Sequence, residues 1–99
     1  MYAVIRHYRS QAGSVEEATR QVQEELLPKV RQIAGFVGYY LFNPSPQEIA
    51  AISLFESQAG AEESVRKAQE WVRQNPDMAR LLPDPPQIIA GEVTLHAGQ

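Results

Sequence analysis

The stretch LLPKVRQIAGFVGYYLF, residues 26–42, contains the change from a helical to a strand pattern on which the fold depends. Gly35 lies where the end of a helix favours a left-handed residue, and residues 36–42 then form an aromatic-rich strand. Pro28 has no amide hydrogen to donate to the carbonyl of Glu24, so it predicts a kink or a break late in the helix. The apolar side chains before Gly35 recur at helical spacing: Val15, Ala18, Val22, Leu26, Val30 and Ile33.

The rest of the chain supplies three further strands and a second helix. Ser14, followed three residues later by Glu17, has the pattern of a capping box at the start of the first helix. The predicted elements are strands at residues 2–9, 36–42, 48–56 and 87–96, and helices between Ser14 and Gly35 and at residues 59–73. Asn75 and Pro76 end or bend the second helix.

The resulting order, βαββαβ, is that of the ferredoxin-like plait. It predicts an α+β fold with an antiparallel four-stranded sheet and two helices on one face of the sheet. The whole chain, residues 1–99, is expected to be a single domain.

The strands are expected to need a partner, because large apolar side chains fall on both faces of the predicted sheet. In residues 36–42, for example, strict alternation puts Phe36, Tyr40 and Phe42 on one side of the sheet. It puts Val37, Tyr39 and Leu41 on the other side. An uncovered apolar face of this size exceeds what a monomer normally exposes. A second copy of the chain is the simplest cover, so we expect a homodimer with the two sheets packed face to face.

The composition excludes several classes of function. The chain has no cysteine, which rules out disulfides, zinc–thiolate sites and thiol catalysis. Its net charge of −3 arises from nine basic residues scattered among twelve acidic ones, unlike a nucleic-acid-binding surface. No apolar run is long enough to span a membrane, and the first residues have a strand pattern rather than that of a signal peptide. We therefore expect a cytoplasmic protein that binds neither nucleic acid nor membrane.

The layout and two phrases of the sequence resemble the dimeric α+β barrel superfamily, and within it the antibiotic biosynthesis monooxygenase-like proteins. The phrases are residues 26–42 and the ending PPQIIAGEVTLH, residues 85–96. The resemblance implies a small pocket between the sheet and the helices of each protomer. It also implies oxidation of a phenol or quinol with no metal, flavin or other cofactor, because the deprotonated substrate can itself reduce O₂.

Trp71, the only tryptophan, is the first candidate for such a pocket. It lies at the edge of the apolar face of the second helix, with Asn75 one turn further along. Trp71 can form the wall of a pocket for a flat ligand, with Asn75 supplying a hydrogen bond. Alternatively, Trp71 seals the edge of the core and Asn75 only ends the helix.

His7 is the candidate base, since a histidine can accept a phenolic proton near neutral pH. A solvated histidine at the end of a strand is the plainer interpretation. Heme-degrading relatives carry an asparagine in this region of the first strand and a heme-ligating histidine on the second helix. The second helix has no histidine here, so the resemblance argues against heme degradation.

Tyrosines and arginines on the strands are weaker candidates. Tyr8, Tyr39 and Tyr40 could donate hydrogen bonds to a substrate oxygen, and Arg6 and Arg9 could attract an acidic ligand. The plainer interpretation is that the tyrosines pack on the sheet and the arginines are solvated.

Two main functional hypotheses follow, and an isomerase or lyase of the same architecture is a third, weaker option. In the first, the homodimer is a cofactor-independent monooxygenase-like protein acting on a small aromatic or quinol compound, with His7 as the base and Trp71, Asn75 and Tyr40 binding the substrate. In the second, the same dimer is a non-catalytic small-ligand-binding or stress-related module. An open cavity beside Trp71 favours the first hypothesis, and a packed one favours the second.

Overall fold

The computed structural model describes residues 1–10 and 14–98. Its helices and strands follow the predicted order, with one additional short helix before the last strand. The elements are β1 (Tyr2–Arg9), α1 (Val15–Gln21), η1 (Val22–Leu26), α2 (Leu27–Arg31), β2 (Phe36–Phe42), β3 (Glu48–Phe55), α3 (Gln58–Gln74), α4 (Pro76–Leu81) and β4 (Gln87–Glu92). The segment η1 is π-helical.

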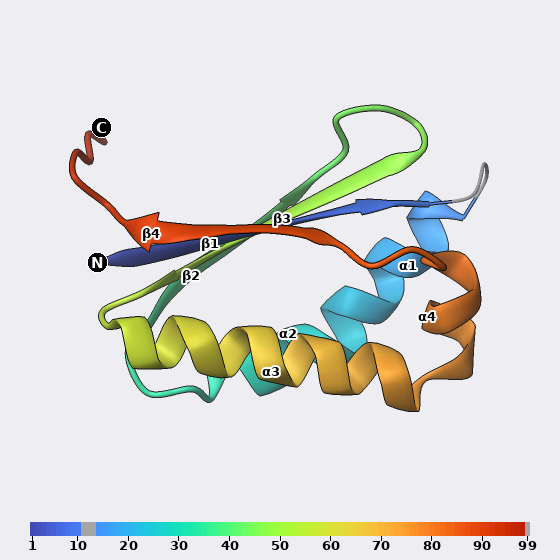
Figure 1. Ribbon diagram of the computed structural model, residues 1–99, viewed down its shortest axis with the longest axis horizontal. Helices are drawn as coiled ribbons and strands as arrows, with labels where there is room; N and C mark the ends of the chain where they lie inside the picture. Colours follow the sequence, from blue (N-terminus) through green and yellow to red (C-terminus); the bar gives the residue numbers. More distant parts are fainter. Residues whose placement is uncertain (11–13, 99) are drawn as a thin grey trace.

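The four strands form one antiparallel sheet in the order β2-β3-β1-β4. The helices all lie on one side of this sheet (Figure 1). This arrangement is the ferredoxin-like α+β plait, so the predicted fold class is confirmed.

The first helical region changes its hydrogen-bonding pattern in the middle. Pro28 stands at the start of α2, where it cannot donate an amide hydrogen bond and its ring crowds the carbonyl four residues earlier. The π-helical segment η1 directly before it is the irregularity that the proline predicted. Gly35 then has φ of 84°, the left-handed conformation expected after the helix. The capping box is not formed, because Glu17 accepts from Arg20 and Gln21 instead.

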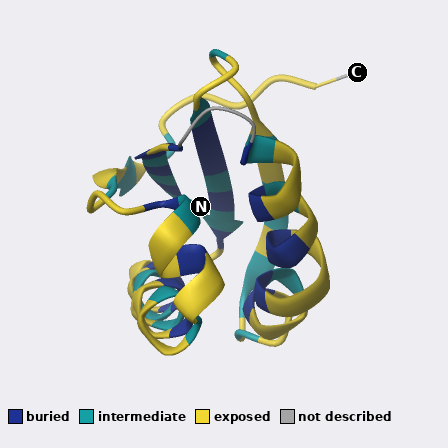
Figure 2. Cartoon of the chain, turned by 90° about the vertical axis from the view of Figure 1, so that its right-hand side faces the viewer, coloured by how far each residue is buried: buried dark blue, intermediate teal, exposed yellow. Residues whose placement is uncertain are grey.

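The core lies between the helices and the helix-facing side of the sheet (Figure 2). Alternation along β1 turns Val4, Arg6 and Tyr8 into this layer. The most deeply buried apolar side chains come from strands and helices alike: Val4, Ala18, Leu26, Val30, Phe55, Ala61, Ala68 and Met78. Each large one contributes about 1.5–3 kcal/mol by leaving water, which holds the helices on the sheet.

The opposite face of the sheet carries a row of apolar side chains across all four strands. The register pairs Tyr40 with Ile52, Ile52 with Ile5, and Ile5 with Ile89. Tyr40 and Ile89 are 62% and 63% exposed. The sheet therefore has a second apolar face, as the strand patterns predicted; below, it is called the open face.

Two details of the strand prediction are wrong. Strict alternation places Phe36 on the open face, but an irregularity between Phe36 and Gly38 shifts the register of β2 against β3. Phe36 instead packs against Phe55 in the core, with ring centroids 5.9 Å apart in an edge-to-face arrangement. The last strand also ends at Glu92, whereas the pattern extends it to residue 96.

Candidate functional site

The candidate site is built around Arg6, which lies in the middle of β1 and is only 3% exposed. Its Nη1 donates to the hydroxyl of Tyr8 at 3.2 Å, and its Nη2 donates to the hydroxyl of Tyr39 at 3.1 Å. The guanidinium carbon also lies 6.0 Å from the centroid of the Tyr8 ring. Strands β1 and β2 thus bring three polar side chains together in the layer that faces the helices; we call them the donor cluster.

Arg6 can be buried because a small residue lies beside it on the neighbouring strand. The register pairs Arg6 with Ala51 of β3, and Ala51 with Leu41 of β2. An alanine here leaves room for the guanidinium to cross β3 and reach Tyr39. The expectation that Arg6 is solvated is therefore wrong, because its strand is internal to the sheet and its side chain faces the helices.

The donor cluster has an excess of hydrogen-bond donors. Within residues 1–10 and 14–98, no carboxylate forms an ion pair with Arg6, and its Nε has no hydrogen-bond partner. Tyr8 and Tyr39 accept from Arg6, so each hydroxyl keeps its own hydrogen to donate. A buried charge that lacks a counter-charge is costly, which makes this arrangement unusual for a purely structural core.

The environment of Tyr39 suits its hydroxyl to keep its proton and to donate a hydrogen bond. Burial raises the pKa of the Tyr39 hydroxyl above its usual value, and the positive charge of Arg6 opposes part of this rise. The hydroxyl therefore stays protonated at neutral pH. It can donate a hydrogen bond to a bound oxygen.

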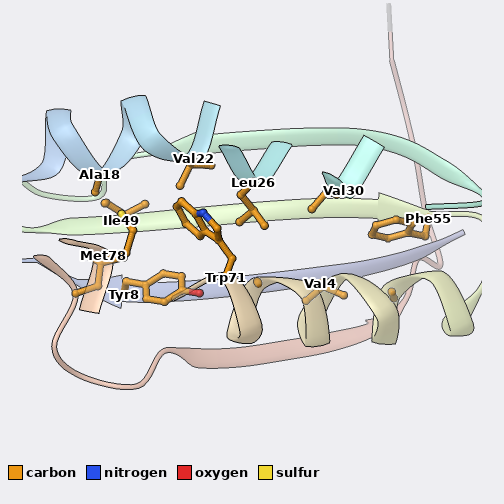
Figure 3. Close-up of a cluster of buried hydrophobic side chains, with 13 residues drawn as sticks. Val4, Tyr8, Ala18, Val22, Leu26, Val30, Ile49, Phe55, Trp71 and Met78 are labelled. Atoms are coloured by element: carbon orange, nitrogen blue, oxygen red, sulfur yellow. The ribbon is translucent and has the colours of Figure 1, made fainter. Parts of the chain in front are cut away.

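The donor cluster lines a small cavity between the sheet and the helices, and η1 and α3 supply the opposite wall. In Figure 3, Trp71 reaches from α3 toward Val22 and Leu26 of the first helical region, with Tyr8 on its other side. The cavity has a volume of about 10 Å³, which is the space of a single water molecule. In this conformation the space beside Trp71 is almost filled.

Trp71 and Asn75 are brought together by one carboxylate. The indole Nε1 of Trp71 donates to Oε1 of Glu25 at 3.0 Å, and Nδ2 of Asn75 donates to the same oxygen at 3.3 Å. Asn75 also donates to Oε1 of Gln21 at 3.0 Å, and its own Oδ1 accepts from two backbone N–H groups at the start of α4. Trp71 is thus a core residue, 5% exposed, that also lines the cavity, and Asn75 caps a helix.

The structure does not bring His7 or Tyr40 to Trp71. His7 alternates with Arg6 along β1 and is directed to the open face, where its Nε2 lies 2.8 Å from Oε1 of Glu48. Tyr40 lies in the apolar row of the same face. Neither residue lines the cavity that holds Arg6. The role of His7 as a base therefore stays a prediction, without support from the geometry around Trp71.

The part of the chain that the structure describes contains no candidate metal site. Residues 1–10 and 14–98 contain no group of three or more His, Cys, Asp or Glu side chains that could hold an ion. Over the same residues, the helices are too short or too polar to cross a bilayer.

Sequence reasoning ranked Arg6 and Tyr39 below His7, although the structure makes them the centre of the site. A signal for Arg6 was present in the period of β1, because Arg6 shares a face with Val4 and Tyr8. A charged residue in the core-facing register of an internal strand indicates a buried polar group, and such groups gather at functional sites. The contact with Tyr39 had no signal, because it spans 33 residues and crosses a strand.

Comparisons with known proteins bear on the fold. Neither a protein-family model nor a curated protein matches the sequence. The monooxygenase from the gene ActVA-Orf6 of Streptomyces coelicolor, solved with the ligand nanaomycin D, matches with a TM-score of 0.75 at 9% identity over 99% of this chain and 91% of that chain. An antibiotic biosynthesis monooxygenase matches with a TM-score of 0.71 at 15% identity over 96% of this chain and 100% of that chain.

A third solved structure is a mutant of MhuD with two manganese protoporphyrin IX molecules bound per active site. It matches with a TM-score of 0.78 at 19% identity over the full length of both chains. The chain therefore has the fold of the antibiotic biosynthesis monooxygenase-like dimeric α+β barrel superfamily, as the sequence resemblance predicted. Identities of this size show a shared fold and do not carry an activity with it.

Proposed function

We propose that this protein is a monooxygenase-like homodimer that acts on a small aromatic or quinol compound in the cavity of each protomer. The observation that carries the proposal is the donor cluster of Arg6, Tyr8 and Tyr39 facing Trp71. In a fold shared with monooxygenases, these donors can hold a substrate oxygen while the indole gives a flat apolar wall.

The chemistry follows from the positive charge of Arg6. A phenolic oxygen held against the guanidinium loses its proton to solvent more readily, because the cation stabilises the phenolate. The electron-rich phenolate then reduces O₂. For a hydroquinone the balanced reaction with one O₂ gives a hydroxyquinone and one water, and the substrate supplies all the electrons. In this scheme Arg6 supplies the positive charge, and Tyr39 donates a hydrogen bond to the substrate oxygen.

The homodimer is inferred from the open face. The row of Tyr40, Ile52, Ile5 and Ile89 would leave an apolar surface in water if the protein were a monomer. Two copies related by a two-fold axis can bury these rows against each other, over an interface on the order of 2,000 Å² or more in total. His7 would then lie in or beside the dimer interface.

The small size of the cavity favours a second candidate function. A site for a drug-sized ligand occupies roughly 300–1,000 Å³, whereas the cavity beside Trp71 has about 10 Å³. A non-catalytic ligand-binding or stress-related dimer of the same fold needs no larger space in its resting state. Any function that places an aromatic molecule beside Trp71 requires the cavity to widen when that molecule binds.

Oxygen uptake with a panel of hydroquinones separates the two functions. We expect the wild-type protein to consume O₂ with at least one hydroquinone, and Arg6→Gln to slow this by about tenfold or more, because it removes the charge that stabilises the phenolate. No uptake with any hydroquinone would leave the non-catalytic function as the better account.

His7→Ala, measured in the same oxygen-uptake assay, tests whether the reaction takes place on the open face. The geometry of the cavity predicts a rate close to that of the wild type, because His7 points away from Trp71. A tenfold loss would instead show that His7 is the base, as the sequence suggested, and would move the reaction to the open face.

A further inference from the structure

We infer that Arg6 makes the cavity selective for aromatic anions, and that such a ligand enters past Leu82 from a surface groove beside α4. The ligand class is an oxyanion carried on an aromatic ring, either an aryl carboxylate or a phenolate. This inference rests on the proposed function, since it names the class of ligand for the same cavity.

The anion preference follows from the balance of donors and acceptors. The unpaired hydrogens of the donor cluster are the Nε–H of Arg6 and the hydroxyl hydrogens of Tyr8 and Tyr39. All three can only be satisfied by an acceptor. A carboxylate or phenolate oxygen accepts several hydrogen bonds and also neutralises the guanidinium, which removes the cost of burying that charge. A neutral ligand satisfies the donors but leaves the charge uncompensated.

The preference for an aromatic ligand follows from the apolar side chains that line the cavity. The cavity is closed by the indole of Trp71 and by aliphatic side chains of η1 and β3, including Val22, Leu26 and Ile49. These surfaces favour a flat apolar body over a flexible polar one. A ligand with a ring at Trp71 and an oxyanion at Arg6 matches the chemistry of both halves of the lining, and the cavity of about 10 Å³ must widen to admit it.

The route into the cavity is indicated by a surface groove of about 330 Å³ between the end of α3, α4 and residues 83–86. Tyr8, Val72 and Leu82 line both this groove and the inner cavity, so these side chains form the wall between them. Leu82 follows the short helix α4, and Pro83 comes directly after it. A shift of this segment would join the groove to the cavity.

Trp71 provides a direct readout of binding, because it is the only tryptophan of the chain and it lines the cavity. We would titrate the wild-type protein with benzoate and with its neutral isostere benzamide, and follow tryptophan fluorescence. We expect benzoate to bind about tenfold or more tightly than benzamide, as a charge-assisted hydrogen bond requires. This comparison needs no variant, so it does not depend on how any substitution folds.

Single substitutions show where benzoate binds and how it enters. Arg6→Gln should reduce benzoate affinity by about tenfold or more and reduce benzamide affinity by less, because only benzoate loses the attraction of the positive charge. Ala79→Phe should slow benzoate association, because Ala79 is an exposed residue that lines the groove, and phenylalanine adds bulk without adding a second tryptophan. Ala59→Phe is the matched control: it places the same bulk on an exposed position of α3, in a different surface crease that contains Lys29 and Lys67.

Equal affinity for benzoate and benzamide in the wild-type protein would overturn the inference. So would loss of benzoate binding in Ala59→Phe but not in Ala79→Phe, because the anion would then sit at the crease with Lys29 and Lys67. Selective benzoate binding without oxygen uptake from any hydroquinone supports the inference and refutes the oxygenase function. Oxygen uptake that benzoate does not inhibit would refute the inference and leave the oxygenase function standing.

Discussion

The indole of Trp71 donates a hydrogen bond to Glu25, which lies 46 residues away in the chain, with Nε1 and Oε1 3.0 Å apart. This bond joins α3 to the π-helical segment η1. It holds the indole ring across the cavity in which Arg6 is buried.

Replacing Trp71 tests whether it serves both the core and the site. Trp71→Phe removes the hydrogen bond to Glu25 and leaves space beside Arg6. We expect the free energy of unfolding in urea to fall by about 1–3 kcal/mol, while the enlarged cavity accepts larger aromatic anions such as 2-naphthoate. Glu25→Gln is the control, since it weakens the same hydrogen bond without creating space. An unchanged unfolding curve for Trp71→Phe would contradict the core position of the indole.

Replacing Arg6 by an apolar residue should stabilise the ligand-free protein. Arg6→Met removes a buried charge that lacks a counter-charge, so we expect the free energy of unfolding to rise by about 1–3 kcal/mol. Arg9→Met, on the same strand but exposed, should change it by less than about 0.5 kcal/mol. A loss of stability in Arg6→Met would show that its hydrogen bonds to Tyr8 and Tyr39 outweigh the cost of burying the charge.

The lowered pKa of Glu48 predicts that the protein loses stability in acid. Hydrogen bonds from Ser45 and His7 hold the pKa of Glu48 below its usual value of 4.5. Because the pKa is lower in the folded state than in the unfolded state, the stabilisation is complete above about pH 4.5 and is lost as the pH falls through the folded-state value.

The measurement for Glu48 is the thermal midpoint of the wild type and of Glu48→Gln between pH 7 and pH 3. We expect the wild type to be the more stable protein near neutral pH, and the difference to shrink below about pH 4.5. Other carboxylates titrate equally in both proteins, so the difference isolates Glu48. A difference that stays constant down to pH 3 would show that the pairing does not lower this pKa.

Adjacent residues on β4 test the proposed dimer interface. Ile89 lies in the apolar row of the open face, whereas Ile88 is paired with Arg6 and faces the other way. Ile89→Glu should convert the dimer to a monomer in analytical ultracentrifugation at micromolar concentration, because it places a charge inside the apolar contact. Ile88→Glu carries the same change one residue away and should remain dimeric. A wild-type protein that is monomeric at that concentration would refute the dimer.

Much of the fold could be predicted because its signals are local. The period of the strands, the left-handed position of Gly35 and the proline of the first helix each act within a few residues. Errors arose where the pairing between strands matters, as at Phe36, where a register shift moves the ring into the core. The additional helix α4 was missed as a helix because its six residues are too few to show a period.

The candidate site depends on contacts that no local pattern encodes. Alternation along β1 turns Arg6 and His7 to opposite faces, and the face that receives the helices is settled only when the layers pack. Ala51 leaves room for the guanidinium only because β3 lies between β1 and β2. Element types and the apolar nature of both sheet faces were therefore determined by the order of residues along the chain. The burial of Arg6, its contact with Tyr39 and the closure of the cavity by Trp71 were decided by tertiary structure, because each requires segments distant in sequence to meet.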